Sequence, residues 1–119
     1  MHELISPSEL AKHGISAQVL LLKFKEQLVK DFEMSNVELD LNLLQSNSIE
    51  DIQNSVADKI KQIPATVLQH LLYRIDISEK QLNEAYIKES NLDRNEVIVN
   101  LIIKRILQKV ILKIVYSKY

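Results

Sequence analysis

Apolar side chains recur every three or four residues through most of the chain, which is the spacing that places them on one face of an α-helix. Three segments show this period clearly: residues 17–33, 49–63 and 65–75. Their apolar positions are Leu20, Leu21, Phe24, Leu28 and Phe32; Ile49, Ile52, Val56, Ile60 and Ile63; and Val67, Leu68, Leu71, Leu72 and Ile75. The pattern predicts three amphipathic helices, each with one face turned toward a core.

Capping motifs predict where the helices begin. In a capping box, Ser, Thr or Asp at the N-cap and an acidic or amide residue three positions later each satisfy a free backbone N–H group. This spacing occurs at Ser6–Glu9, Ser48–Asp51, Ser78–Gln81 and Asp93–Glu96. Three further signals complete the pattern: an N-cap at Ser16, a C-terminal cap at Gly14 and a break at Pro64. The motifs together predict six helices, over about 7–13, 17–33, 49–63, 65–75, 79–89 and 94 to near the C-terminus.

The segment from Val37 to Leu43 breaks the helical pattern. Val37, Leu39, Leu41 and Leu43 alternate with polar residues, and this period of two is typical of a strand. A single strand is not stable alone. We therefore interpret the segment as an extended loop held by its leucines, and the alternative is a short strand that pairs with a second copy of itself.

The last helix, from Arg94, is long, apolar and basic, and its polar residues shift around the helix axis halfway along. These residues step by four and then continue by four after a shift of one; they are Glu96, Asn100, Lys104 and Gln108, followed by Lys109, Lys113 and Ser117. Because each residue turns the helix by about 100°, the apolar faces of the two halves point in different directions. We expect the first half to pack on the core, and the second half to meet another part of this chain or another chain.

Composition favours an all-α, single-domain bundle of five or six helices over residues 1–119. The chain has 119 residues with one glycine and two prolines, whereas a sheet protein of this length needs many tight turns. It contains no cysteine and no apolar N-terminal leader, and four basic residues interrupt its most apolar stretch, so no membrane span is expected. We expect a cytoplasmic protein.

Charge is unevenly distributed along a chain whose net charge is −1. Residues 31–58 contain seven acidic and no basic side chains, whereas residues 97–119 contain five basic and no acidic ones. The two stretches are complementary, either by packing within one molecule or by association between two chains. The sequence does not distinguish the two arrangements.

No motif points to catalysis, a cofactor or a metal site. The three histidines, His2, His13 and His70, form no pair at metal-ligand spacing, and the single glycine, Gly14, excludes a glycine-rich phosphate loop. We therefore predict a non-enzymatic protein–protein interaction or structural module that associates with itself through its last helix. The interaction candidates are Lys109, Val110, Ile111, Lys113, Ile114, Val115 and Tyr116.

The alternative function is nucleic-acid binding. Residues 9–16, with Gly14-Ile15-Ser16 as the turn, resemble a helix-turn-helix motif, and the resemblance implies a DNA-binding role for the helix that follows. That helix opens with apolar residues, which disfavours contact with DNA. The basic residues available for phosphates would be Lys104, Arg105, Lys109 and Lys113.

Overall fold

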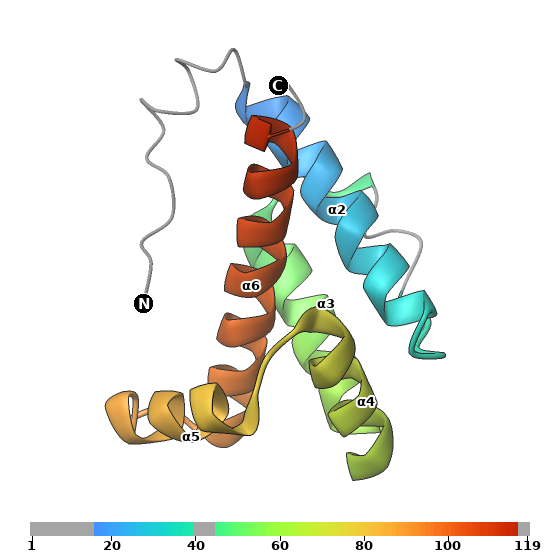
Figure 1. The fold of residues 1–119 in the computed structure, drawn as a ribbon. Helices are drawn as coiled ribbons and strands as arrows, with labels where there is room; N and C mark the ends of the chain where they lie inside the picture. The colour runs from blue at the N-terminus through green and yellow to red at the C-terminus, as the bar shows by residue number, and fades with distance from the viewer. Residues whose placement is uncertain (1–15, 40–44, 117–119) are drawn as a thin grey trace.

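The computed structural model describes residues 16–39 and 45–116, and within them it contains five α-helices and no strand. The helices are α2 (Ala17–Glu33), α3 (Ile49–Gln62), α4 (Ala65–Ile75), α5 (Glu79–Lys88) and α6 (Arg94–Tyr116). α6 runs through the middle and packs against the other four (Figure 1). The predictions of a helical fold and a long last helix are therefore confirmed. The short helix expected at 7–13, with its cap at Gly14, lies outside the described residues.

Capping side chains begin four of the five helices, as the sequence predicts. In each case a serine or aspartate side chain accepts a hydrogen bond from the backbone N–H three residues later. The donor and acceptor residues are Val19 and Ser16, Asp51 and Ser48, Gln81 and Ser78, and Glu96 and Asp93. At Ser78 the capping box is complete, because Gln81 Oε1 also accepts from the Ser78 N–H at 2.9 Å.

Ser78→Ala is expected to lower the free energy of unfolding by about 1 kcal/mol, because it leaves an N–H group of α5 without its acceptor. Chemical denaturation of the variant and the parent protein measures the difference. Asn83→Ala, an exposed change within the same helix, is the control and should shift stability less. Equal losses in the two variants would show that the cap does not stabilise α5.

The C-terminal ends of α2 and α4 are followed by residues in the left-handed region. Asn36 has φ 60° and Asp76 has φ 73°, and Asn and Asp tolerate this region better than other non-glycine residues. The next residues, Val37 and Ile77, donate their N–H groups back to carbonyl oxygens of the preceding helix, both at 2.9 Å. Both side chains are buried, so each turn also directs an apolar residue into the core.

The described part of the alternating segment is a loop. Residues 37–39 have no regular secondary structure; Val37 and Leu39 are buried, whereas Glu38 between them is exposed. The alternation at these positions therefore reflects inward and outward side chains of an extended loop. Leu41 and Leu43 lie outside the described residues. After the gap, Lys25 of α2 donates from Nζ to the Ser46 carbonyl oxygen at 2.8 Å, which ties the start of α3 to α2.

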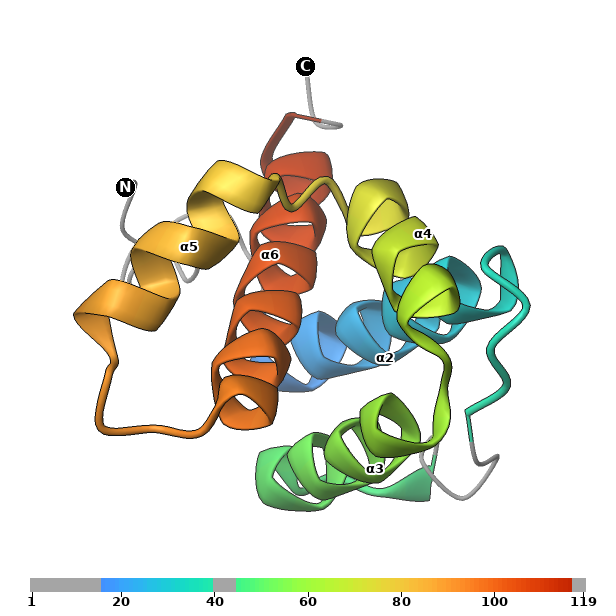
Figure 2. The same ribbon diagram turned by 90° about the horizontal axis from the view of Figure 1, so that it is seen from below.

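The core lies between α6 and the buried faces of α2, α3 and α4. Its principal side chains are Phe24, Leu28 and Phe32; Ile52, Val56 and Ile60; Leu71, Leu72 and Ile75; and Ile98, Val99, Ile102, Ile106 and Val110. Figure 2 shows α5 on the left of α6 and α4 on its right, with α3 below. α5 contributes no buried residue. The structure differs from the sequence pattern at Ile49, which is 47% exposed because burial on α3 begins one turn later, at Ile52.

The two halves of α6 pack differently, but the division lies later than the polar pattern suggests. Val110 is buried in the main core because it follows Ile106 by four residues and keeps the same face. Ile111 is also buried, but it belongs to a separate cluster with Leu20 of α2. Leu20, Leu107 and Ile114 contact both clusters, so the face that meets the main core extends past Val110 to Ile114.

Candidate interaction surface

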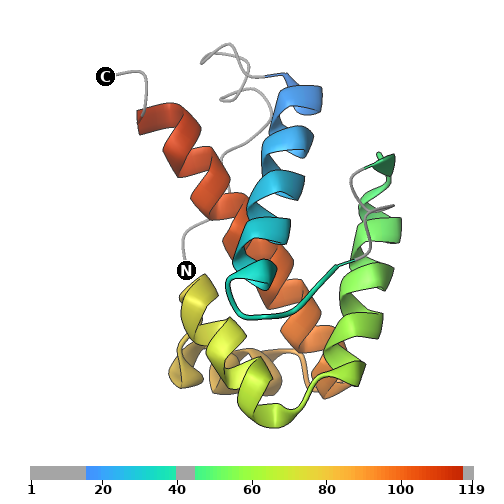
Figure 3. The same cartoon turned by 90° about the vertical axis from the view of Figure 1, so that its right-hand side faces the viewer.

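Large exposed apolar side chains are present on the first turns of α2 and on the last turns of α6, which lie at one end of the molecule. Eight such side chains are exposed among the described residues, and four of them are at this end. They are Val19 and Leu22 of α2 and Leu112 and Tyr116 of α6, and we call them the end surface. Figures 1 and 3 place the first turns of α2 and the last turns of α6 at the same end, and Figure 3 shows the two helices diverging there.

Leu112 and Tyr116 lie one turn apart near the end of α6. Because each residue turns the helix by about 100°, Leu112 points about 160° away from the buried Val110. Leu112 is 44% exposed and Tyr116 is 67% exposed. The last turns of α6 therefore present two large apolar side chains to solvent. Exposed apolar residues that cluster in this way mark interaction sites more often than isolated ones do.

Six of the seven interaction candidates fall into three environments. Val110 and Ile111 are each only 3% exposed, so the fold of this chain already covers them. Ile114 and Val115 are half-buried. Tyr116 is well exposed, and Lys113 is exposed beside it. Leu112 belongs with these last two, although the sequence analysis did not select it.

The seventh candidate, Lys109, takes part in a polar network that joins α2, α4 and α6. Its Nζ lies 3.4 Å from Oδ2 of Asp31 and 3.3 Å from the carbonyl oxygen of Arg74 at the end of α4. Asp31 is 4% exposed and also accepts from Gln27 Nε2 at 3.1 Å. Lys113 donates to Gln27 Oε1 at 2.8 Å. Lys109 thus serves the fold, because it offsets a buried carboxylate and a helix C-terminus at once.

The Lys109–Asp31 pair connects the acidic and basic stretches of the sequence within one molecule. It is the one ion pair between these stretches among the described residues. The acidic side chains of α3, Glu50, Asp51 and Asp58, are exposed instead. Most of the acidic surface of α3 is therefore available to groups outside this chain.

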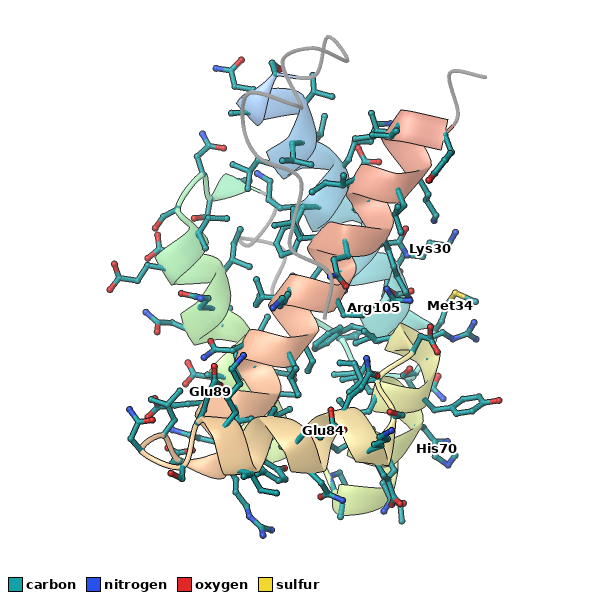
Figure 4. The ribbon with its side chains drawn as sticks, turned by 60° about the vertical axis from the view of Figure 1, so that its left-hand side comes forward. Lys30, Met34, His70, Glu84, Glu89 and Arg105 are labelled. Atoms are coloured by element: carbon teal, nitrogen blue, oxygen red, sulfur yellow. The ribbon has the colours of Figure 1, made fainter. Side chains whose placement is uncertain are left out.

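The basic residues considered for nucleic acid do not form a free cluster. Arg105 makes an ion pair with Asp76 at 2.8 Å, and Figure 4 shows Arg105 between α6 and the side where α4 lies. Lys109 is engaged by Asp31. Phosphate binding by Arg105 or Lys109 would therefore compete with contacts inside the chain, which weakens the case for a basic DNA-binding face.

Two grooves border α6. The first, about 200 Å³, lies between α2 and the end of α6; it has Val110 and Ile114 on its apolar side, and its charged residues are three lysines, Lys23, Lys30 and Lys113, and one carboxylate, Glu26. The second, about 490 Å³, lies between α5 and the start of α6; it includes Ala85, Leu101 and Lys104, together with two carboxylates that Figure 4 labels, Glu84 of α5 and Glu89, which follows that helix. The first groove adjoins the end surface and gives it a basic edge.

The described residues hold no group of three His, Asp or Glu side chains that could bind a metal ion, and His70 is exposed on α4. His2 and His13 lie outside those residues. No helix in residues 16–39 or 45–116 is both long and apolar enough to cross a membrane. Comparison of the chain with models of known protein families, with curated proteins and with solved structures gives no match in any of the three.

Proposed function

We propose that this chain is a non-enzymatic, cytoplasmic protein–protein interaction module that associates with a second copy of itself through the end surface. The observation that carries the proposal is the concentration of half of the exposed large apolar side chains, Val19, Leu22, Leu112 and Tyr116, at one end. The cytoplasmic location rests on the sequence, which contains no cysteine and so fits a reducing compartment.

The composition of the end surface suits an interface. Tyrosine is enriched in interfaces because its ring buries a large area while its hydroxyl group still finds a polar partner. Tyr116 lies one helical turn from Leu112, and the neighbouring lysines Lys23 and Lys113 form a polar edge. An apolar centre with a charged rim is the usual arrangement of a specific contact.

Charge supports a second copy of this chain as the partner. The edge of the end surface is basic, whereas α3 exposes Glu50, Asp51 and Asp58. A second copy therefore supplies both the apolar residues and the opposite charge that this edge requires. Contacts between such complementary surfaces speed association and fix its orientation, and they weaken as salt screens them.

Leu112→Glu combined with Tyr116→Glu is expected to abolish self-association and leave the fold intact, because both side chains are exposed and accept a charge without burial. The measurement is sedimentation or light scattering over a concentration series to about 100 μM, since micromolar affinity is expected of a modest interface. The control is Tyr73→Glu with Ile87→Glu, whose parent side chains are 87% and 79% exposed on other helices.

A parent protein that remains monomeric over this range would refute self-association, and equal dissociation by the control would refute the position of the surface. Circular dichroism verifies that each variant keeps its helices. Ile111→Glu is unsuitable here, because Ile111 is buried and a carboxylate at that position would unfold the end of α6. A salt-dependent shift of a mixed DNA probe by the parent protein would favour the nucleic-acid alternative instead.

A further inference from the structure

The outer face of α2 carries four exposed charged residues that form one line along the helix. They follow one another by three, four and three positions, and such positions lie within about 80° of one another around the helix axis. Lys30 stands two residues from the buried Leu28 and from the buried Phe32, so it points about 160° away from each. We call the four residues the α2 stripe: Lys23, Glu26, Lys30 and Glu33.

The outer face of α3 carries four exposed polar residues at the same spacing. Asp58 stands two residues from the buried Val56 and from the buried Ile60, so it also points away from the core. We call the four residues the α3 stripe: Asp51, Asn54, Asp58 and Lys61. Within residues 16–39 and 45–116, no ion pair joins the two stripes of one chain.

The order of the charges decides how the two stripes match. If the two helices lie side by side in the same direction, opposite charges meet at three of the four positions. The pairs are then Lys23 with Asp51, Lys30 with Asp58, Glu33 with Lys61, and Glu26 with the neutral Asn54. If the helices lie in opposite directions, like charges meet at three positions, for example Lys23 with Lys61. Because like charges across a contact repel, the parallel arrangement is the favourable one.

The two stripes lie on opposite sides of the molecule. Lys25 follows Lys23 by two residues and so points about 160° away from it, and its Nζ donates to the Ser46 carbonyl oxygen just before α3 at 2.8 Å. α3 therefore begins on the side of α2 away from Lys23. Figure 4 agrees, with α3 at the left edge of the molecule and Lys30 on the right. A contact between two different surfaces on opposite sides leaves one surface of each kind open after two copies have joined.

We propose that copies of this chain associate head to tail, with the α3 stripe of one copy parallel to the α2 stripe of the next, so that association continues past two copies. The inference rests on the proposed self-association and adds its register. The α2 stripe continues the end surface, because Val19 stands one turn before Lys23 on the same side of α2. Figure 3 shows α2 and α3 running in the same direction, so successive copies point the same way. The apolar end surface supplies affinity and the stripes set orientation, since exposed ion pairs alone contribute little affinity.

Exchanging charges within a stripe tests the register without changing the net charge. Lys30→Glu with Glu33→Lys reverses two positions of the α2 stripe, and Asp58→Lys with Lys61→Glu reverses the two positions opposite to them. Each double variant is expected to raise the dissociation constant at least about tenfold in sedimentation at low salt, where screening is weak. All four changes in one chain restore opposite charges at both pairs and should return the constant to within about threefold of the parent value. The control, Glu84→Lys with Lys88→Glu, is the same kind of exchange at exposed positions of α5 and should leave association unchanged.

The mass of the parent assembly should rise past that of two copies as its concentration increases, and an assembly that stops at two copies would overturn head-to-tail association. Failure of the four changes to recover association would overturn the register. If Leu112→Glu with Tyr116→Glu abolishes association but the charge exchanges have no effect, the pairing of the stripes is wrong and the end surface stands. A parent protein that stays monomeric refutes both proposals.

Circular dichroism verifies that each charge-exchange variant keeps its helices. If one of the double variants does not fold, the neutral changes Lys30→Gln and Asp58→Asn replace it. Each of these should weaken association by a smaller factor than charge exchange does, because it removes one attraction and adds no repulsion. Unchanged association in both neutral variants would overturn the pairing of Lys30 with Asp58.

Discussion

Ile106→Ala is expected to lower the free energy of unfolding by about 2–5 kcal/mol, which is a large share of the stability of a domain of this size. Ile106 is fully buried in the main core at the middle of α6. Removing its outer carbons loses their transfer from water and leaves a cavity that the surrounding helices fill only in part. Urea denaturation followed by far-ultraviolet circular dichroism measures the loss.

Leu112→Ala is the matched control, because it removes a side chain of the same size from a position 44% exposed in the same helix. The burial lost there is smaller and no closed cavity forms, so the expected cost is less than about 1 kcal/mol. A similar loss in both variants would contradict the assignment of Ile106 to the core and Leu112 to the surface.

Lys109→Met is expected to lower the free energy of unfolding by about 2–4 kcal/mol, because it leaves the buried carboxylate of Asp31 without its cation. The Asp31 side chain is 5% exposed, and after the change the donor left to it is Gln27 Nε2. The same denaturation measurement applies. Asp31→Leu combined with Lys109→Met should recover most of the loss, since no charge then remains buried.

Lys113→Met is the control for Lys109→Met. Lys113 bonds to Gln27 rather than to a carboxylate, and it is exposed, so its loss should change stability by less than about 1 kcal/mol. Equal effects of the two lysine variants would show that the ion pair with Asp31 does not stabilise the fold. Failure of the double variant to recover stability would show that Asp31 has a further role in packing.

The helices could be predicted from the sequence because their signals are local. The period of the apolar residues and the caps at Ser48, Ser78 and Asp93 involve residues at most a few positions apart, and the observed helices begin where these signals place them. Pro64 likewise separates α3 from α4. Such signals act through the backbone of one turn and do not depend on the rest of the fold.

The burial of individual polar and apolar residues was harder to predict. Asp31 follows Phe24 by seven residues and Leu28 by three, so the helical period alone places it on the buried face of α2. Its partner, Lys109, is 78 residues away, and no local pattern relates the two. From the sequence alone, Asp31 could be either a buried aspartate with a partner or a polar residue at which the apolar pattern ends. The tertiary structure was needed to tell the two apart.

The interaction candidates stay a prediction, and the exposed residues near them could not be identified from the sequence for a similar reason. The shift in the polar positions leads to Lys109 and Lys113, whereas the large exposed apolar residues of the last turns are Leu112 and Tyr116. Which side of these turns faces solvent depends on where α2 crosses α6, and that crossing is not encoded locally.

The position of α6 in the chain also governs the order in which the protein can fold during synthesis. α2 and α3 pack mainly against α6, which leaves the ribosome after every other described helix. At about 5–20 residues per second, several seconds separate the emergence of α2 from that of α6. The faces of α2 and α3 that pack on α6 lack this cover during the interval.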